Sequence, residues 1–161
     1  MIYSTLQISQ LTDSKLIGNP DILISNISFD SRNLYSISDT AFIAINTKNN
    51  SGEKYISSVV EKGVKVIISE NYYPEYEDIT WIITKNSIEF LQILAKKHLE
   101  NSHLENTIGI TGSNGKTIVK EWLYQCLWDE FSTVKSPKSF NSQIGLPISL
   151  LQINEEHQLG I

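Results

Sequence analysis

The sequence predicts an α/β protein built from two parts. Through residues 1–100, short apolar runs typical of buried strands alternate with stretches of helical periodicity, which favours helices packed on a sheet. After a polar segment at 101–106, a glycine-bearing turn stands between an expected strand and an expected helix in residues 107–128. We therefore expect a small N-terminal α/β domain over 1–100, a linker over 101–106, and the first βα units of a second domain over 107–161.

The first part is expected to open with a short helix capped by Ser4, because a serine hydroxyl accepts hydrogen bonds from the backbone of the first turn. A helix through 55–60 is expected to end at Gly63, and a further helix to begin with Ser87 as its cap and to carry His98 near its edge. The strands of this part are expected over 22–29, 41–45, 64–68 and 79–84.

The second part is expected to begin with a buried strand over Thr107–Thr111. The following helix carries an apolar stripe of Val119, Trp122, Leu123, Cys126 and Leu127. A strand over 131–134 and a short helix over 148–152 come next. Phosphate-loop proteins place an acidic residue for Mg²⁺ on a later strand. None is identifiable here, so we expect this second domain to be truncated.

The composition narrows the classes of function. The net charge of −5 and the pI near 5.2 argue against a nucleic-acid partner held by bulk electrostatics. No apolar run approaches the ~20 residues that span a bilayer, and no signal peptide is visible. The single cysteine, Cys126, fits a reducing compartment and is expected to be a buried structural thiol. We expect a cytoplasmic protein with no nucleic-acid and no membrane partner.

The strongest chemical signal is the segment Gly112-Ser113-Asn114-Gly115-Lys116-Thr117. Glycines let backbone N–H groups turn toward an anion, and the N-terminus of the next helix adds partial positive charge. Lys116 can reach the β- and γ-phosphates of a nucleotide, and the hydroxyl of Thr117 can bind Mg²⁺. The alternative is a hairpin turn at Asn114-Gly115. Residues 116–128 disfavour it, because their apolar positions recur at helical spacing.

The residues around this loop resemble the Mur ligases, the amide ligases that build the peptide of bacterial peptidoglycan. The strict phosphate-loop pattern has glycine where this chain has Ile110, whereas this family uses the T-G-[TS]-N-G-K-T form found at 111–117. Two other stretches are similar: Asp30-Ser31-Arg32 followed by the apolar run at 41–45, and the N-x-x-x-G-x-P segment that starts at Asn141. The resemblance runs in order through nearly the whole chain and is strongest for members that add the terminal dipeptide.

The resemblance implies a reaction and its participants. With ATP and Mg²⁺, such a ligase phosphorylates the carboxylate of a UDP-N-acetylmuramoyl-tripeptide, and the amine of D-alanyl-D-alanine then attacks the acyl phosphate. Lys116 would stabilise charge on the transferred phosphoryl group, and Thr117 would help to hold Mg²⁺. These two residues are the expected catalytic residues.

The resemblance also implies a site for the uridine nucleotide at Asp30, Ser31 and Arg32, with Arg32 as a bidentate partner of the diphosphate. The alternative for these three residues is an Asx- or Ser-type turn with a solvated arginine. Asn141 is either a substrate contact or a loop amide that satisfies local backbone groups. The chain has Ser51-Gly52-Glu53 where the family often has Asp-Gly-His, which leaves the details of the muramoyl contacts open.

Other functions stay open: a non-catalytic module that binds a uridine nucleotide, the ligase that adds the third peptide residue, and an unrelated phosphate-loop kinase. Some sequence segments also resemble those of ligases fused to an alanine racemase domain. Pyridoxal phosphate would be a cofactor only if such a domain follows in the parent protein. We expect a ligase in the full-length parent and an inactive fragment in this chain alone. His98, His103 and His157 do not have the spacing of a metal-binding set.

Overall fold

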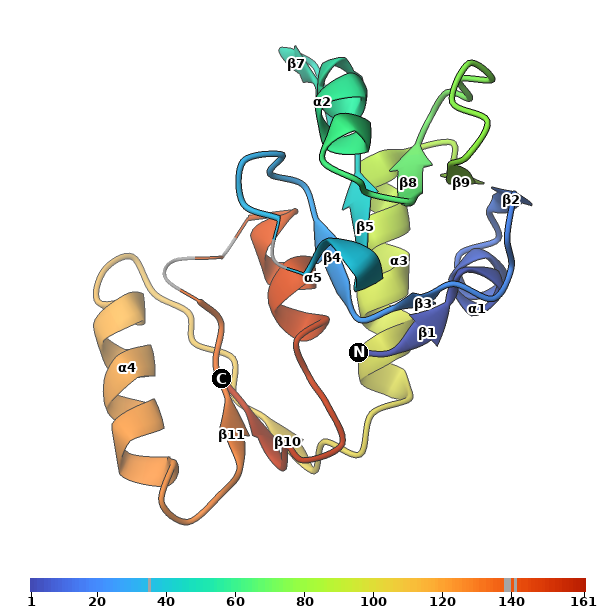
Figure 1. The fold of residues 1–161 in the computed structure, drawn as a ribbon. Helices are drawn as coiled ribbons and strands as arrows, with labels where there is room; N and C mark the ends of the chain where they lie inside the picture. Colours follow the sequence, from blue (N-terminus) through green and yellow to red (C-terminus); the bar gives the residue numbers. More distant parts are fainter. Residues whose placement is uncertain (35, 138–139, 141) are drawn as a thin grey trace. The chain divides into compact units, whose positions relative to one another are not determined.

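The computed structural model describes residues 1–34, 36–137, 140 and 142–161 (Figure 1). It forms two compact units, Met1–Leu94 and Ala95–Ile161, and the predicted α/β class is confirmed. The division falls within helix α3 (Ser87–Glu100), ahead of the polar segment at 101–106 that the sequence predicts as a linker. The assignment of separate functions to the two parts stays a prediction.

The first unit is organised on a five-stranded sheet in the order β2-β9-β8-β5-β4. Its parallel strands are β4 (Asn26–Ser28), β5 (Thr40–Ile43), β8 (Val66–Ser69) and β9 (Thr80–Ile83), and β2 (Lys15–Ile17) runs antiparallel to β9. All residues of β5 and β8 are buried, which explains why the sequence showed them as continuous apolar runs.

The single strand predicted over 22–29 is wrong, because this stretch divides between two sheets. β3 (Leu23–Ile24) pairs antiparallel with β1 (Tyr3–Ser4), whereas β4 belongs to the five-stranded sheet. Ser25 separates the two strands, and its backbone N–H donates to the carbonyl of Asp39 at 2.9 Å. Asp39 closes the 3-10 turn η1 (Ile37–Asp39), so tertiary contacts decide the break.

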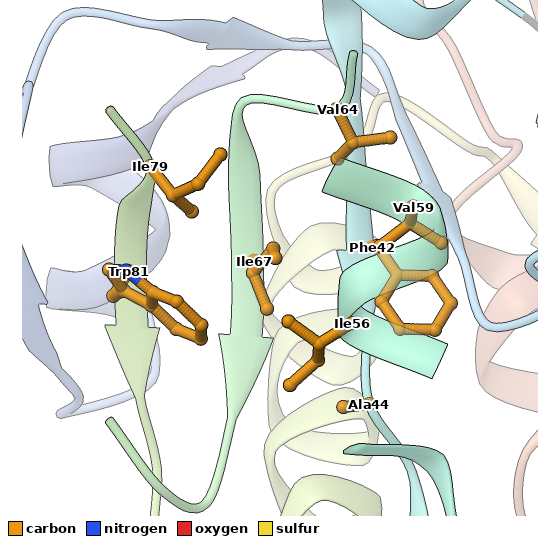
Figure 2. Close-up of a cluster of buried hydrophobic side chains, with 8 residues drawn as sticks. All are labelled: Phe42, Ala44, Ile56, Val59, Val64, Ile67, Ile79 and Trp81. Carbon is orange, nitrogen blue, oxygen red and sulfur yellow. The ribbon is translucent and has the colours of Figure 1, made fainter. Parts of the chain in front are cut away.

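One face of the five-stranded sheet packs against helix α2 (Ile56–Glu61), as Figure 2 shows. Side chains alternate across a strand, so Phe42 lies on this face while its neighbours Ala41 and Ile43 lie on the other, and all three are fully buried. Burial of each large apolar side chain contributes about 1.5–3 kcal/mol. The cluster on the α2 face consists of Phe42, Ala44, Ile56, Val59, Val64, Ile67, Ile79 and Trp81.

The helix boundaries of the first unit follow the predictions in two cases. Helix α1 (Thr5–Leu11) begins with a capping box in which the hydroxyl of Ser4 accepts from the N–H of Gln7 at 3.1 Å, and the side chain of Gln7 accepts from the N–H of Ser4 at 2.8 Å. Helix α2 is followed by Gly63 with φ of +97°, the left-handed conformation expected after a helix.

The predicted cap of helix α3 is wrong. The side-chain oxygen of Asn86 accepts from the N–H groups of Ile88 and Glu89, both at 3.0 Å, so Asn86 performs that role. Ser87 is fully buried, and its hydroxyl donates to Glu70 at 2.8 Å and accepts from the N–H of Asn46 at 3.0 Å. Asparagine and serine are comparable caps. The choice between them depended on which side chain the fold buries.

The segment after β5 forms a small hairpin of β6 (Asn46–Thr47) and β7 (Asn50–Ser51), followed by the 3-10 turn η2 (Gly52–Tyr55). Gly52 lies directly against the backbone of Ala44 and Ile45, which follow β5, and its N–H donates to the carbonyl of Ile45 at 2.9 Å. A side chain at this position has no room.

The second unit contains three short parallel strands in the order β10-β12-β11, which are β10 (Asn106–Thr107), β12 (Leu159–Gly160) and β11 (Thr133–Val134). Helix α4 (Lys116–Leu127), helix α5 (Gly145–Leu150) and the end of α3 from Ala95 belong to the same unit. The strand predicted within 131–134 is confirmed. The helix predicted over 148–152 begins three residues earlier and ends two residues earlier, and the hydroxyl of Ser142 accepts from the N–H of its first residue, Gly145, at 2.9 Å.

The buried strand predicted over Thr107–Thr111 is wrong in both length and burial. Both residues of β10 are exposed, and its ladder ends where the N–H of Ile108 donates to the carbonyl of Gly160 at 2.8 Å. Among the described strands β10 pairs with β12 alone. Apolar, β-branched composition therefore identified the strand, but the length of its pairing partner set where it stops.

His98 is buried at 7% exposure, not placed at a helix edge as predicted. Its Nε2 lies 2.8 Å from the carbonyl oxygen of Ile153, a contact inside the second unit between α3 and the segment after α5. Burial lowers the pKa of His98 below its ordinary value of 6.5, because the charged imidazolium would lose its hydration.

We expect Gly52→Ala to lower the free energy of unfolding of the first unit by about 1–3 kcal/mol. The new Cβ would lie 2.5 Å from the nitrogen of Ile45 and 2.8 Å from the carbonyl carbon of Ala44. Both are backbone atoms, so relieving the clash would require the backbone to move. Amide hydrogen exchange of β5 and β8 measures the effect. Gly109→Ala is the matched control, since a Cβ there meets nothing within 4 Å. Equal acceleration of exchange in the two variants would contradict this explanation.

The stability of the second unit is expected to fall as the pH drops through about 6.5. The folded-state pKa of His98 is lowered, so near that pH the unfolded chain takes up a proton that the folded chain does not. The contribution of neutral, buried His98 to the stability of the folded unit is therefore present above the pKa of the unfolded state and is lost as the pH falls below it. Urea unfolding between about pH 5 and pH 8 measures it. His98→Gln should make the free energy of unfolding depend less on pH than it does in the wild type. The pKa of His157 is also lowered, but this residue is present in both proteins, so its contribution cancels when the two curves are compared.

Candidate functional site

The segment from Gly112 to Gly115 forms a turn that leads directly into α4. Gly112 has φ of +147° and Gly115 has φ of +78°, conformations that side-chain-bearing residues rarely adopt. A Cβ on Gly115 would meet nothing within 4 Å, so backbone conformation rather than space requires glycine there. The predicted strand, glycine turn and helix are therefore present in this order, and the alternative of a hairpin at Asn114-Gly115 is wrong.

The first turn of α4 has the features of an anion site. Gly115 is the N-cap and supplies no side-chain hydrogen bond, so the amide groups at the start of this 12-residue helix have no cap of that kind. Such N–H groups, together with the helix dipole, favour a negatively charged ligand. Lys116 is the first residue of the helix, and its ammonium donates to the carbonyl oxygen of Gly112. The lysine and the loop therefore already lie together.

A cavity of about 390 Å³ lies beside this loop within the second unit. Its wall includes the carboxyl ends of all three parallel strands, together with Lys116, Thr117 and Lys120 of α4. Open α/β sheets bind ligands where their strands end in this way. The loop is thus placed where the topology favours a ligand, and α5 contributes Leu146, Ser149 and Leu150 to the same wall.

The buried face of α4 differs from the predicted stripe. Trp122 is 64% exposed and Val119 is 42% exposed, whereas Lys120 is only 5% exposed. Cys126 is a free and exposed cysteine, so its prediction as a buried thiol is wrong. Leu123 and Leu127 of the predicted stripe are half-buried, and they share the inward side of the helix with Lys116 and Lys120 at the same helical spacing.

Polar contacts explain why this side of α4 faces inward. The ammonium of Lys120 donates to the carbonyl oxygen of Ser136 at 2.6 Å and lies 3.4 Å from a carboxylate oxygen of Glu121. The same carboxylate accepts from Lys135, whose ammonium lies 4.0 Å from the ring centroid of Tyr124. The hydrogen bond from Lys135 is the main reason why the pKa of Glu121 is lowered.

The second candidate group, Asp30, Ser31 and Arg32, lies in the first unit after β4. Two nitrogens of Arg32, Nε and Nη2, each lie 2.9 Å from a different carboxylate oxygen of Asp30, and the backbone N–H of Arg32 donates to Asp30 at 3.0 Å. This is an Asx turn closed by its own salt bridge. The side chain of Arg32 is 84% exposed, and these hydrogen bonds lower the pKa of Asp30 to about 2.

The turn is tied to α2 by a residue that the sequence did not indicate. The ammonium of Lys62 donates to the carbonyl oxygen of Ser31 at 2.6 Å, across 31 residues of chain. Two cations, Arg32 and Lys62, therefore lie at one turn, which is compatible with a phosphate-bearing ligand. The sequence held no periodic or motif signal for Lys62, whereas Lys120 could have been noticed as the residue one helical turn after Lys116.

The described residues contain no group of three or more His, Cys, Asp and Glu side chains that could hold a metal ion. Any Mg²⁺ at the loop would therefore depend on the hydroxyl of Thr117 together with oxygens of the ligand and water. Asn141 lies outside the described residues. None of the described helices is both long and apolar enough to cross a membrane.

Comparison with known proteins places this geometry in a family. A family model described as the Mur ligase middle domain matches residues 110–161. The UDP-N-acetylmuramoyl-tripeptide–D-alanyl-D-alanine ligase of Borreliella burgdorferi is 33% identical over 160 residues, which cover 90% of this chain and 34% of that protein. The crystal structure of MurF from Acinetobacter baumannii matches with a TM-score of 0.89 and 26% identity over 99% of this chain and 35% of that one. The chain belongs to the Mur ligase family.

A further solved Mur ligase was determined with a bound nucleotide. The MurF ligase from Thermotoga maritima, solved in complex with ADP, matches with a TM-score of 0.69 and 27% identity over 84% of this chain and 30% of that one. Ile110, which departs from the strict phosphate-loop pattern, is the first residue of the family match. The chain spans about a third of the length of the curated relatives that it matches, such as 34% and 35% of the first two.

Arg32→Gln is expected to raise the pKa of the Asp30 carboxyl from about 2 toward its ordinary value of 3.8, because the hydrogen bonds of Arg32 are the main cause of the shift. The stabilisation from this pair is present above about pH 3.8 and is lost as the pH falls toward 2. NMR titration of the carboxyl carbon measures the change. Lys62→Gln is the matched control and should raise the pKa less, since Lys62 acts on Asp30 only through space. The opposite ranking would contradict the assignment.

Proposed function

We propose that this chain is the N-terminal part of an ATP-dependent amide ligase that joins D-alanyl-D-alanine to a UDP-N-acetylmuramoyl-tripeptide. The observation that carries the proposal is the phosphate loop, with its two positive-φ glycines and an uncapped helix start at the carboxyl ends of three parallel strands. The proposal is supported by the similarity of this chain to proteins named for that reaction. The similarity to the Borreliella burgdorferi ligase covers 90% of this chain.

In this proposal the loop binds the phosphates of ATP. The N–H groups at the start of α4 donate to phosphate oxygens, and Lys116 exchanges its contact with Gly112 for the transferred phosphoryl group. Ser113 and Asn114 are exposed beside the two glycines, so their backbone can approach the ligand. The related MurF ligase from Thermotoga maritima was solved in complex with ADP, which supports an adenine nucleotide as a ligand of this chain.

Mg²⁺ would neutralise charge on the phosphates and polarise them for transfer. Thr117 is the residue of this chain proposed to bind it. Its position is exposed and follows Lys116 directly, which suits a hydroxyl ligand beside the phosphates. The matches give no support for a fused racemase domain, so pyridoxal phosphate has no place in the proposal.

The uridine nucleotide is proposed to bind at Asp30, Ser31 and Arg32, with Arg32 as the partner of the diphosphate. The local Asx turn does not oppose this role. The ion pair is exposed to water, which screens its attraction, so the guanidinium can leave Asp30 for a phosphate at small cost. Asn141 remains a proposed contact of the muramoyl substrate.

Two alternatives differ in what the chain should bind. A non-catalytic module would bind a UDP-N-acetylmuramoyl-peptide and ignore ATP. The ligase that adds the third peptide residue would bind ATP together with a UDP-N-acetylmuramoyl-dipeptide in preference to the tripeptide. Calorimetry of this chain with each compound separates these functions from the proposed one.

Lys116→Ala is expected to weaken ATP binding by at least about tenfold, because a charge-assisted hydrogen bond contributes about 1.5–3 kcal/mol. Binding of the uridine nucleotide should stay within about twofold, since its proposed site lies in the other unit. Arg32→Ala is the reciprocal variant and should weaken only the uridine nucleotide. Calorimetry with both ligands measures the two affinities. Equal loss of both in either variant would contradict two separate sites.

A further inference from the structure

We propose that Lys120 is a positioning residue that holds the phosphate loop in its binding conformation, by bridging α4 to the backbone at the end of β11. This inference rests on the proposed ATP-binding role of the loop. Lys120 lies one helical turn after Lys116, on the same side of α4. The reaction proposed above gives it no chemical role.

The burial of Lys120 is the first support. Lysine is almost never fully buried unless it is paired, because a charged amine loses its hydration inside a protein. Lys120 is 5% exposed, and its ammonium donates to the carbonyl oxygen of Ser136 at 2.6 Å. Glu121 lies 3.4 Å from the same ammonium and supplies a compensating charge. A buried amine with these contacts is held in one geometry.

The acceptor of this hydrogen bond is itself anchored to the sheet. The backbone N–H of Ser136 donates to the carbonyl of Ile161 at 2.9 Å, and the N–H of Ile161 donates to the carbonyl of Val134 at 2.9 Å. Ser136 is therefore fixed at the point where β11 and β12 end. The bridge from Lys120 joins α4 to that point, 16 residues away in sequence.

The loop itself has few other restraints. Gly112, Ser113, Asn114 and Gly115 are all exposed, and two glycines give this segment a large conformational entropy in the absence of restraints. Its carboxyl end is continuous with the first turn of α4, so the position of the helix determines where the loop amides and Lys116 lie. Because a helix is stiff over one turn, fixing Lys120 fixes the start of the helix.

Lys135 provides a matched comparison. It also pairs with Glu121, but its other described contact is the ring of Tyr124 on the same helix, so it does not reach the backbone at the strand ends. Lys120→Met and Lys135→Met remove one positive charge each. The proposal therefore requires that they differ in their effect on the loop.

The test measures ATP affinity with Mg²⁺ by calorimetry, and the amide resonances of Gly112 and Gly115 by NMR without nucleotide. Lys120→Met should weaken ATP binding about tenfold and displace both resonances, since it removes a charge-assisted hydrogen bond. Lys120→Arg, which keeps the charge and the donors, should recover most of the affinity. Lys135→Met should change the affinity less than about threefold.

Stability is separated from positioning by His98→Gln, which alters a buried contact between α3 and Ile153 and involves no residue of α4. It should leave the ATP affinity and the loop resonances unchanged even if the second unit unfolds more easily. Should Lys120→Met not fold, Lys120→Gln carries the same expectation, because its side chain is too short to reach Ser136.

Wild-type affinity with unmoved loop resonances in the folded Lys120 variants would overturn the inference, as would an equal loss in Lys135→Met or in His98→Gln. Failure of the wild-type chain to bind ATP is a different result. It would overturn the proposed function, whereas displaced glycine resonances in Lys120→Met would still show that Lys120 positions the loop.

Discussion

The conformation of two glycines is the constraint on which the second unit depends. Gly112 and Gly115 adopt positive φ angles, and this turns the backbone so that α4 starts without a side-chain cap. N–H groups at a helix start that lack a side-chain cap have no hydrogen-bond partner within the protein, and they can donate to the oxygens of a bound phosphate. The three parallel strands end beside this loop, so the cavity, the loop and Lys116 occupy one edge of the sheet.

The candidate group in the first unit follows a different principle, because its charges are satisfied internally. Arg32 and Asp30 neutralise one another, and Lys62 holds the turn through the carbonyl of Ser31. Such a turn is pre-ordered, and its exposed salt bridge contributes little energy, so a phosphate could replace Asp30 as the partner of Arg32 without rearranging the backbone.

The comparison of α4 with its prediction shows what periodicity can and cannot decide. The helix was predictable from residues at spacings of three and four, but two faces of it satisfy that spacing. Hydrophobicity favoured the face with Trp122 and Cys126, which is exposed. The face with Lys120 is buried because Ser136 and Glu121 satisfy its ammonium, and both contacts exist only after the chain has folded.

The sequence by itself determined the α/β class, the buried strands β5, β8 and β9, the phosphate loop and the resemblance to Mur ligases. These features depend on local composition, on alternation and on a short motif, all of which are present in consecutive residues. Only the tertiary structure decided the cap of α3, the division of the stretch at 22–29, the burial of His98 and the partners of Lys62 and Lys120. Each of these depends on groups that are distant in sequence and that packing alone brings together.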